Sequence, residues 1–137
     1  MKKLMITIAA VFLLSACGKT EITPQTVTFT LDSNPTTGFS WQVEQSEELF
    51  EVKTDFNAEE GDKPDVGAGG VETITLIPLK AGKTEVTLTY ARPWEGGEQS
   101  DQLVYTFEID KNLQVVMSNA YSLSAEAPIS TPAPVIQ

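Results

Sequence analysis

The sequence predicts an all-β fold, a single antiparallel sandwich of about seven short strands. Three observations lead to this prediction. Apolar and polar residues alternate with a period of two in one segment after another, turn-forming residues separate these segments, and no segment shows convincing helical periodicity. With 137 residues, 41% of them hydrophobic, the chain can bury one small core and leaves no room for a second.

Each expected strand is defined by this alternation. In chain order the expected strands cover residues 27–31, 39–43, 49–56, 71–79, 86–90, 103–109 and 113–117. The second contains Trp41, a candidate core aromatic, and the third has the weakest pattern. The fourth and fifth are separated by Ala81, Gly82 and Lys83 and are expected to pair as a hairpin. Seven such strands are typical of an immunoglobulin-like antiparallel β-sandwich, whose loops cluster at two ends.

The residues after the last expected strand have a different composition. From 118 to 137 the alternation is lost, and Ser, Ala and three prolines accumulate. Because proline cannot join a central strand and favours an extended chain, we expect a disordered tail at 118–137.

The first residues have the pattern of an export signal. Lys2 and Lys3 precede an apolar run of about a dozen residues, too short for a membrane span, which needs roughly 20. The run ends in Leu-Ser-Ala before Cys17, the only cysteine. This sequence resembles the lipobox of bacterial lipoproteins, in which cleavage precedes a cysteine that is then acylated, for example with palmitate. We expect a signal peptide at 1–16, and a lipidated Cys17 with a tether at 17–25.

The lipobox resemblance implies a location. Several acyl chains on Cys17 would hold the protein at a membrane durably, since each buried methylene contributes about 0.8 kcal/mol. We therefore expect an exported protein that is lipid-anchored at the bacterial cell envelope. Gly18, rather than Asp, follows the cysteine, which permits the outer membrane; in a single-membrane cell the anchor can only be in the plasma membrane. Loss of Lys2 and Lys3 with the signal changes the formal charge from -10 to -12.

The composition excludes several classes of function. The sequence has no histidine and one cysteine, which excludes Ser-His-Asp and Cys-His catalysis, imidazole metal sites and cysteine-rich zinc sites. No pair of carboxylates is distinguished by spacing or by an apolar setting, as a glycosidase requires. The net charge of -10 has the wrong sign for a nucleic-acid partner. We expect no enzymatic activity, no cofactor and no metal ion.

The connection between the first two strands has a stiff, blunt sequence. It runs from Asn34 through Pro35, Thr36 and Thr37 to Gly38. Pro35 fixes its own φ and restricts Asn34, whereas Gly38 permits a positive φ where the chain enters the next strand. The loop is therefore expected to present its two threonines at the tip.

Two further loops are unusual. The long acidic segment 57–70 lacks the ligand spacing of a calcium loop and ends in four small residues that allow close backbone approach: Gly67, Ala68, Gly69 and Gly70. In the third loop Pro93 ends a strand between Arg92 and Trp94. Arginine and tryptophan often anchor interfaces, so a Trp in this hydrophilic loop indicates a contact residue.

Together and in this order, the three loops resemble those of the chagasin family of proteinaceous inhibitors of papain-like cysteine peptidases. The likeness consists of NPTTG at 34–38 followed by Phe39 and Trp41, GAGG at 67–70 and RPW at 92–94. It covers about residues 27–117, within an expected domain at 26–117. The resemblance implies an immunoglobulin-like sandwich with three binding loops at one end.

The resemblance also implies a role for each loop. Residues 34–38 would form the central loop, with Thr36 against the peptidase's catalytic cysteine and histidine. Residues 67–70 would take one flank of the cleft, and residues 92–94 the other, with Trp94 packing on aromatic surface of the enzyme. The implied function is reversible, tight-binding inhibition by shape, for which a monomer suffices.

A different class of function is compatible with the fold alone. An envelope-anchored immunoglobulin-like adhesion or assembly module could use Trp94 and the acidic loop to bind a host protein, a glycan or a neighbouring envelope protein. This alternative does not explain why the three loop motifs occur together.

Overall fold

The computed structural model describes residues 21–58, 69–94, 96–97, 99–123 and 131–137. The expected signal peptide, Cys17, Gly67 and Ala68 lie outside these residues. Within the described ranges, no helix is long and apolar enough to cross a membrane.

The described residues form eight strands and one short 3-10 turn, η1 (Pro35–Thr37). The strands are β1 (Val27–Ser33), β2 (Ser40–Gln45), β3 (Phe50–Ala58), β4 (Gly70–Pro78), β5 (Gly82–Ala91), β6 (Gln99–Ile109), β7 (Val115–Ser122) and β8 (Val135–Ile136).

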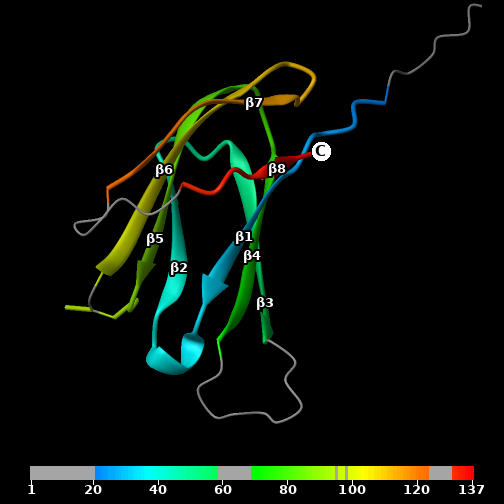
Figure 1. Ribbon diagram of the computed structural model, residues 1–137. Coiled ribbons are helices and arrows are strands. Elements are labelled where there is room, and N and C mark those ends of the chain that lie inside the picture. The colour runs from blue at the N-terminus through cyan, green and yellow to red at the C-terminus, as the bar shows by residue number, and fades with distance from the viewer. Residues whose placement is uncertain (1–20, 59–68, 95, 98, 124–130) are drawn as a thin grey trace, which may run out of the picture.

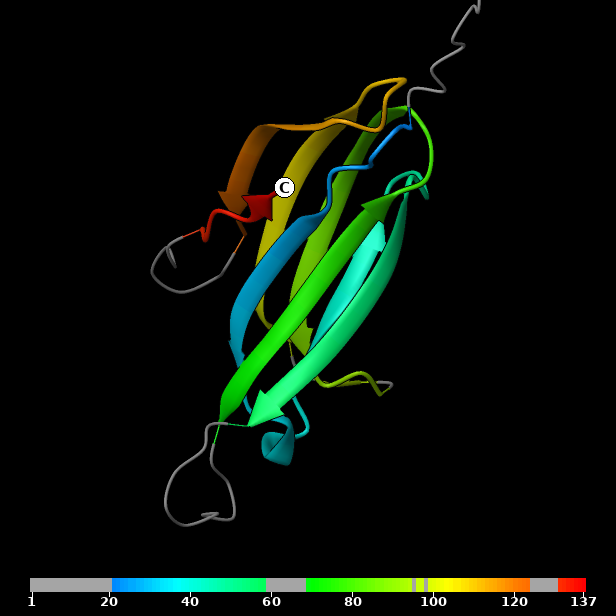
Figure 2. The same ribbon diagram turned by 90° about the vertical axis from the view of Figure 1, so that its right-hand side faces the viewer.

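These strands form two antiparallel sheets packed face to face (Figures 1 and 2). One sheet has the order β3-β4-β1-β8 and the other β2-β5-β6-β7. The predicted all-β sandwich is confirmed, with eight strands instead of about seven. The additional strand, β8, has only two residues, too few to show a period of two.

The predicted hairpin between the fourth and fifth strands was wrong. β4 and β5 belong to different sheets, because both edges of β4 already have partners. β1 pairs along one edge, from Val27 opposite Leu76 to Ser33 opposite Gly70, and β3 pairs along the other. The turn after Pro78 therefore carries the chain from one sheet to the other.

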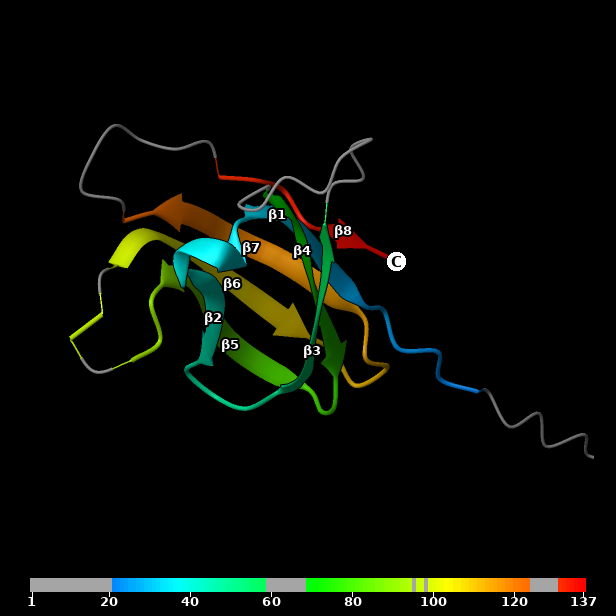
Figure 3. The ribbon, with the colours of Figure 1, turned by 90° about the horizontal axis from the view of Figure 1, so that it is seen from below.

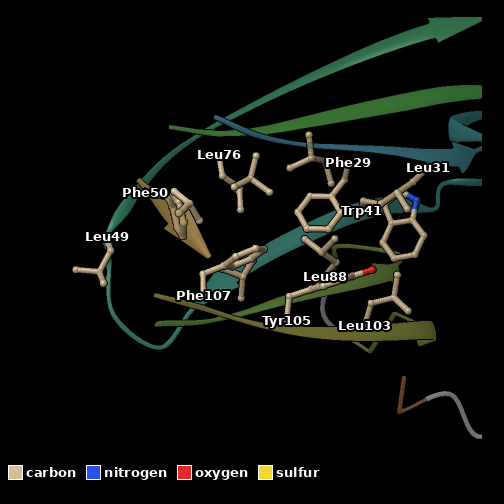
Figure 4. Packing of buried hydrophobic residues seen from close by; sticks show 14 of the residues in the cluster. Phe29, Leu31, Trp41, Leu49, Phe50, Leu76, Leu88, Leu103, Tyr105 and Phe107 are labelled. Atoms are coloured by element: carbon tan, nitrogen blue, oxygen red, sulfur yellow. The ribbon is translucent and has the colours of Figure 1, made fainter. Parts of the chain in front are cut away.

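The core lies between the sheets and is rich in aromatic side chains (Figure 4). The rings of Phe29 and Tyr105 have centroids 4.7 Å apart, and those of Phe50 and Phe107 are 5.6 Å apart. Trp41, the predicted core aromatic, is 8% exposed. Each large apolar side chain buried in this way contributes about 1.5–3 kcal/mol, so the inward-facing alternation accounts for the packing of the two sheets.

The prediction of disorder at 118–137 was wrong for two stretches. β7 continues to Ser122, and Val135–Ile136 pair with β1. Thr26 and Gln137 exchange backbone hydrogen bonds of 2.7 and 3.0 Å. The prolines lie outside the two-residue β8 (Val135–Ile136), which forms the edge of its sheet, so they do not interrupt its pairing.

The folded domain also includes a residue that was expected to belong to the tether at 17–25. The backbone N–H of Gln25 donates to the Leu113 carbonyl at 3.0 Å, and its side-chain Oε1 accepts from the Val115 N–H at 3.0 Å. Gln25, assigned to the tether, therefore belongs to the domain.

Tyr105 is expected to make stability depend on alkaline pH. Burial raises the pKa of its phenol to about 12, whereas an unfolded chain loses that proton near pH 10. Because the folded state holds more protons between these values, the free energy of unfolding should be unaffected below pH 10 and fall by about 2–3 kcal/mol by pH 12. Urea unfolding at pH 8, 10 and 12 should show this loss relative to Tyr105→Phe. Equal pH dependences of the two proteins would contradict the assignment.

Candidate functional site

The described parts of the three loops lie at one end of the sandwich. β1 ends, β4 begins and β5 ends there, at the lower end in Figure 1, and Figure 3 shows this end toward the viewer. Ser33 is opposite Gly70, and Ser40 is opposite Ala91, so the strand registers bring the loop stems together.

The central loop is held in one shape by Asn34. The Asn34 Oδ1 accepts from the Thr36 N–H at 3.3 Å and from the Thr36 hydroxyl at 2.5 Å. The Thr37 hydroxyl donates to the Asn34 carbonyl at 2.6 Å. Pro35, Thr36 and Thr37 are exposed, as expected for a tip, but both hydroxyl protons are used within the loop. The exposed surface is therefore a fixed shape.

Gly38 closes this loop in a conformation that requires glycine. Its φ is 85° and its N–H donates to the Pro35 carbonyl at 3.0 Å. A Cβ added there would lie 2.5 Å from Cη2 of Trp94, so another residue would strain the backbone and displace the Trp94 ring. The indole ring of Trp94 consequently lies directly against the central loop.

Tyr90 connects the loop to the core. Its hydroxyl oxygen accepts a hydrogen bond of 2.9 Å from the Asn34 N–H. Its ring lies between those of Phe39 and Trp41, at centroid separations of 5.3 and 5.0 Å. Trp41 is anchored in turn, because its Nε1–H donates to the Asp32 carbonyl at 3.0 Å.

Arg92 joins two loops. Its Nε–H donates to the Thr37 carbonyl at 3.2 Å, and its guanidinium carbon lies 4.7 Å from the ring centroid of Phe39 and 5.8 Å from that of Trp94. These are distances at which a cation is attracted to an aromatic face. Arg92 therefore connects the central loop to the loop at 92–94. The five side chains in contact, from the core outward, form what we call the aromatic column: Trp41, Tyr90, Phe39, Arg92 and Trp94.

The glycines at the start of β4 bring Gly69, at the end of the 67–70 loop, beside the central loop. A Cβ on Gly70 would collide with the Asn57 carbonyl and the Phe56 ring, because Gly70 is buried between β1 and β3. At Gly69 the nearest atoms are the Ser33 oxygen and Cβ of Asn34, at 3.5 and 4.0 Å from an added Cβ. Only Gly69 of the described pair is therefore placed to present backbone beside the central loop.

Sequence reasoning missed the parts of the site that connect the loops. Tyr90 was only the last residue of the strand expected at 86–90. Glu72, which is 8% exposed, accepts a 3.3 Å hydrogen bond from the Trp41 N–H in the opposite sheet. A glutamate at an inward position of an alternating strand was the available signal. In the part of the chain that the structure describes, no three His, Cys, Asp or Glu side chains gather as metal ligands would.

Comparison with known proteins identifies the family. Residues 23–109 match the model of the chagasin family of peptidase inhibitors, I42. The chain therefore belongs to the chagasin family, which consists of protease inhibitors and not of enzymes.

The chain is similar to individual proteins of Entamoeba histolytica and Trypanosoma cruzi. The chain is 39% identical over 70 residues to Amoebiasin-2 of Entamoeba histolytica, covering 50% of this chain and 57% of the relative. It is 40% identical over 72 residues to Chagasin of Trypanosoma cruzi, covering 48% and 64%. The matches thus span less than two thirds of these relatives. The crystal structure of the cysteine protease inhibitor EhICP2 from Entamoeba histolytica is similar with a TM-score of 0.54 and 33% identity, covering 62% of this chain and 78% of that one.

Replacing the hydroxyl of Tyr90 should loosen the central loop. In Tyr90→Phe the Asn34 N–H loses its acceptor, and we expect the free energy of unfolding to fall by about 1 kcal/mol. Amide hydrogen exchange at Asn34 should become faster, while Tyr121→Phe, the same change on β7, should leave that exchange unaltered. Unchanged exchange of Asn34 in Tyr90→Phe would show that the hydrogen bond does not hold the loop.

Proposed function

We propose that this protein is a reversible, tight-binding inhibitor of papain-like cysteine peptidases, whose three loops enter the active-site cleft as a wedge. The observation that carries the proposal is the direct connection between two loops through Arg92, Gly38 and Trp94 at one end of a chagasin-family domain. The choice of peptidase class is supported by the relative EhICP2, which is described as a cysteine protease inhibitor.

The central loop is suited to fill a cleft without reacting. Pro35 and Thr36 are exposed at its tip, while the hydroxyls of Thr36 and Thr37 donate to Asn34 within the loop. Because these hydrogen bonds already fix the loop, binding would cost little conformational entropy. Such preorganisation supports high affinity from an interface of the usual protease–inhibitor size, about 1,600 Å².

The other two loops would contact the two sides of the cleft. We assign the loop at 67–70 to one flank, where the small residues Gly67, Ala68 and Gly69 allow the backbones to approach and the buried Gly70 holds the stem of the loop between β1 and β3. Pro93 and Trp94 would take the other flank. Trp94 is 56% exposed although one part of its ring lies against Gly38. A large aromatic side chain that is held from behind and exposed in front is typical of an interface hot spot.

A titration tests this function. The protein lacking residues 1–17 is added to papain, and to trypsin as a control, while substrate cleavage is followed at fixed enzyme concentration. We expect stoichiometric, reversible inhibition of papain and no effect on trypsin. A folded protein that inhibits none of several papain-like peptidases would contradict the proposal and favour the adhesion or assembly module.

The contribution of Trp94 can be measured in the same assay. Trp94→Ala should weaken inhibition by about 1–3 kcal/mol, roughly five- to 150-fold, as truncation of a hot spot does. Leu79→Ala is the matched control, because Leu79 is also 56% exposed and follows β4 at the opposite end of the sandwich. An inhibition constant unchanged by Trp94→Ala would exclude the proposed contact.

We also propose that the protein is exported and anchored through an acylated Cys17 at the bacterial cell envelope. The proposal is supported by the lipobox sequence and by the position of Cys17 ahead of the domain. The full-length protein should incorporate labelled palmitate and should fractionate with membranes. Cys17→Ala should abolish both, because the thiol is the proposed acyl acceptor. Incorporation into Cys17→Ala equal to that of the wild type would rule out this anchor.

A further inference from the structure

Among the strands that the structure describes, β3 is the longest of those at a sheet edge. It has nine residues and is paired on one side only, by β4 (Figure 1). The Phe50 N–H donates to Gln45 Oε1 at 2.9 Å and the Phe50 carbonyl accepts from Gln45 Nε2 at 3.0 Å, so both groups face away from β4. Because alternate residues of a strand face the same edge, the backbone N–H and C=O groups of Val52, Thr54 and Phe56 also lie along this open edge.

The other sheet edges are shorter or are partly closed by side chains. β8 has two residues. On β7 the Ala120 N–H donates to Asn119 Oδ1 at 3.0 Å, and on β2 the Trp41 N–H donates to the Glu72 carboxylate at 3.3 Å. Such internal acceptors compete with pairing by another chain. Beyond Phe50, no described side chain bonds to the backbone of β3 in this way.

The side chains of β3 alternate in charge and leave both of its faces accessible. Glu51, Lys53 and Asp55 are exposed on the outer face, where the Lys53 ammonium and the Glu51 carboxylate form a loose ion pair of 4.0 Å. On the inner face Val52 is half-buried and Phe56 is 39% exposed. Charges usually protect an edge strand from pairing, but alternating signs can be matched by a partner strand of the same sequence.

A second copy of β3 fits this edge in one register. If two β3 strands run antiparallel about a two-fold axis at Thr54, the two Thr54 residues face each other. Lys53 of each copy then faces Asp55 of the other on the outer face, and Val52 faces Phe56 on the inner face. Opposite-charge, Thr–Thr and aromatic–β-branched pairs across strands are all favourable. The backbone groups that face the edge meet in this register, so each facing pair can exchange two hydrogen bonds.

The neighbouring registers bring like charges together. With the axis at Lys53, the two lysines face each other and Glu51 faces Asp55. With the axis at Asp55, the two aspartates face each other. The net charge of -10 makes two copies repel at a distance, so a register that matches opposite charges locally is favoured over these alternatives.

We propose that two copies of this protein associate through their β3 strands and form a symmetric dimer with one sheet continuous across the interface. The same surface is used by both copies, as a two-fold axis requires. Because the strands are antiparallel, the two central loops lie at opposite ends of the dimer and stay accessible, so the dimer does not depend on the proposed inhibition. Pairing of one strand edge buries less than the standard interface of about 1,600 Å², so we expect weak, concentration-dependent association.

Sedimentation velocity tests the dimer. The protein lacking residues 1–17, which keeps every described residue, is measured over about a hundredfold range of concentration. Physiological ionic strength is used, because it screens exposed charges beyond about 8 Å. We expect the sedimentation coefficient to rise with concentration from the monomer value toward the dimer value. The monomer value at every concentration would overturn the proposal.

Charge reversals test the register. Lys53→Glu and Asp55→Lys each place like charges opposite each other twice in the symmetric dimer, so either should weaken association about tenfold. An equimolar mixture of the two variants should associate again, because opposite charges then face each other. Lys80→Glu, the same charge change at an exposed residue outside β3, should associate like the unchanged protein. Equal association of Lys53→Glu and Lys80→Glu, or a mixture that stays monomeric, would overturn the assignment to β3.

Discussion

The guanidinium group of Arg92 makes the contacts on which the shape of the loop end of this protein depends. It donates to the Thr37 carbonyl of one loop and lies near the aromatic rings of Phe39 and Trp94. Below it, Phe39 contacts Tyr90 and Tyr90 contacts Trp41. The aromatic column therefore runs without interruption from the core to the exposed indole. Arg92, which sequence reasoning assigned to the peptidase contact, also fixes two loops relative to each other within the molecule.

This arrangement explains how the loop end of the domain can hold a precise surface. Polar groups at the loop are used internally: Asn34 accepts from Thr36, and Tyr90 accepts from Asn34. Glu72 adds a connection between the sheets, because its carboxylate accepts from the Trp41 N–H at the edge strand β2. An inward-facing charge that satisfies an edge strand also discourages pairing with another chain. β2, which follows the central loop, is thus held by its pairing with β5 and by the hydrogen bond to Glu72 of the other sheet.

The sequence was most informative where a local pattern determines the structure. The alternation around Phe29, Trp41 and Tyr105 was sufficient to predict the strands and the core, and Gly38 indicated the positive φ. Pairing partners were not predictable in the same way, since the edges of β4 are occupied by strands distant in sequence. β8 was missed because a two-residue edge strand has no period and lies among prolines. The column was missed because Tyr90 and Arg92 act through contacts with residues about 55 positions away.

The course of β1 has a mechanical consequence. Thr26 and β8 lie at one end of this strand and the central loop follows its other end (Figure 1). If the domain is held by its N-terminal side while a bound protein pulls on the loops, the force acts along β1. The seven residue pairs with β4 are then strained together, because antiparallel hydrogen bonds lie perpendicular to the strands. Sliding β1 out requires breaking them nearly simultaneously, whereas peeling would break them in turn. The topology thus makes the connection between the N-terminal side of the domain and the loops resistant to tension.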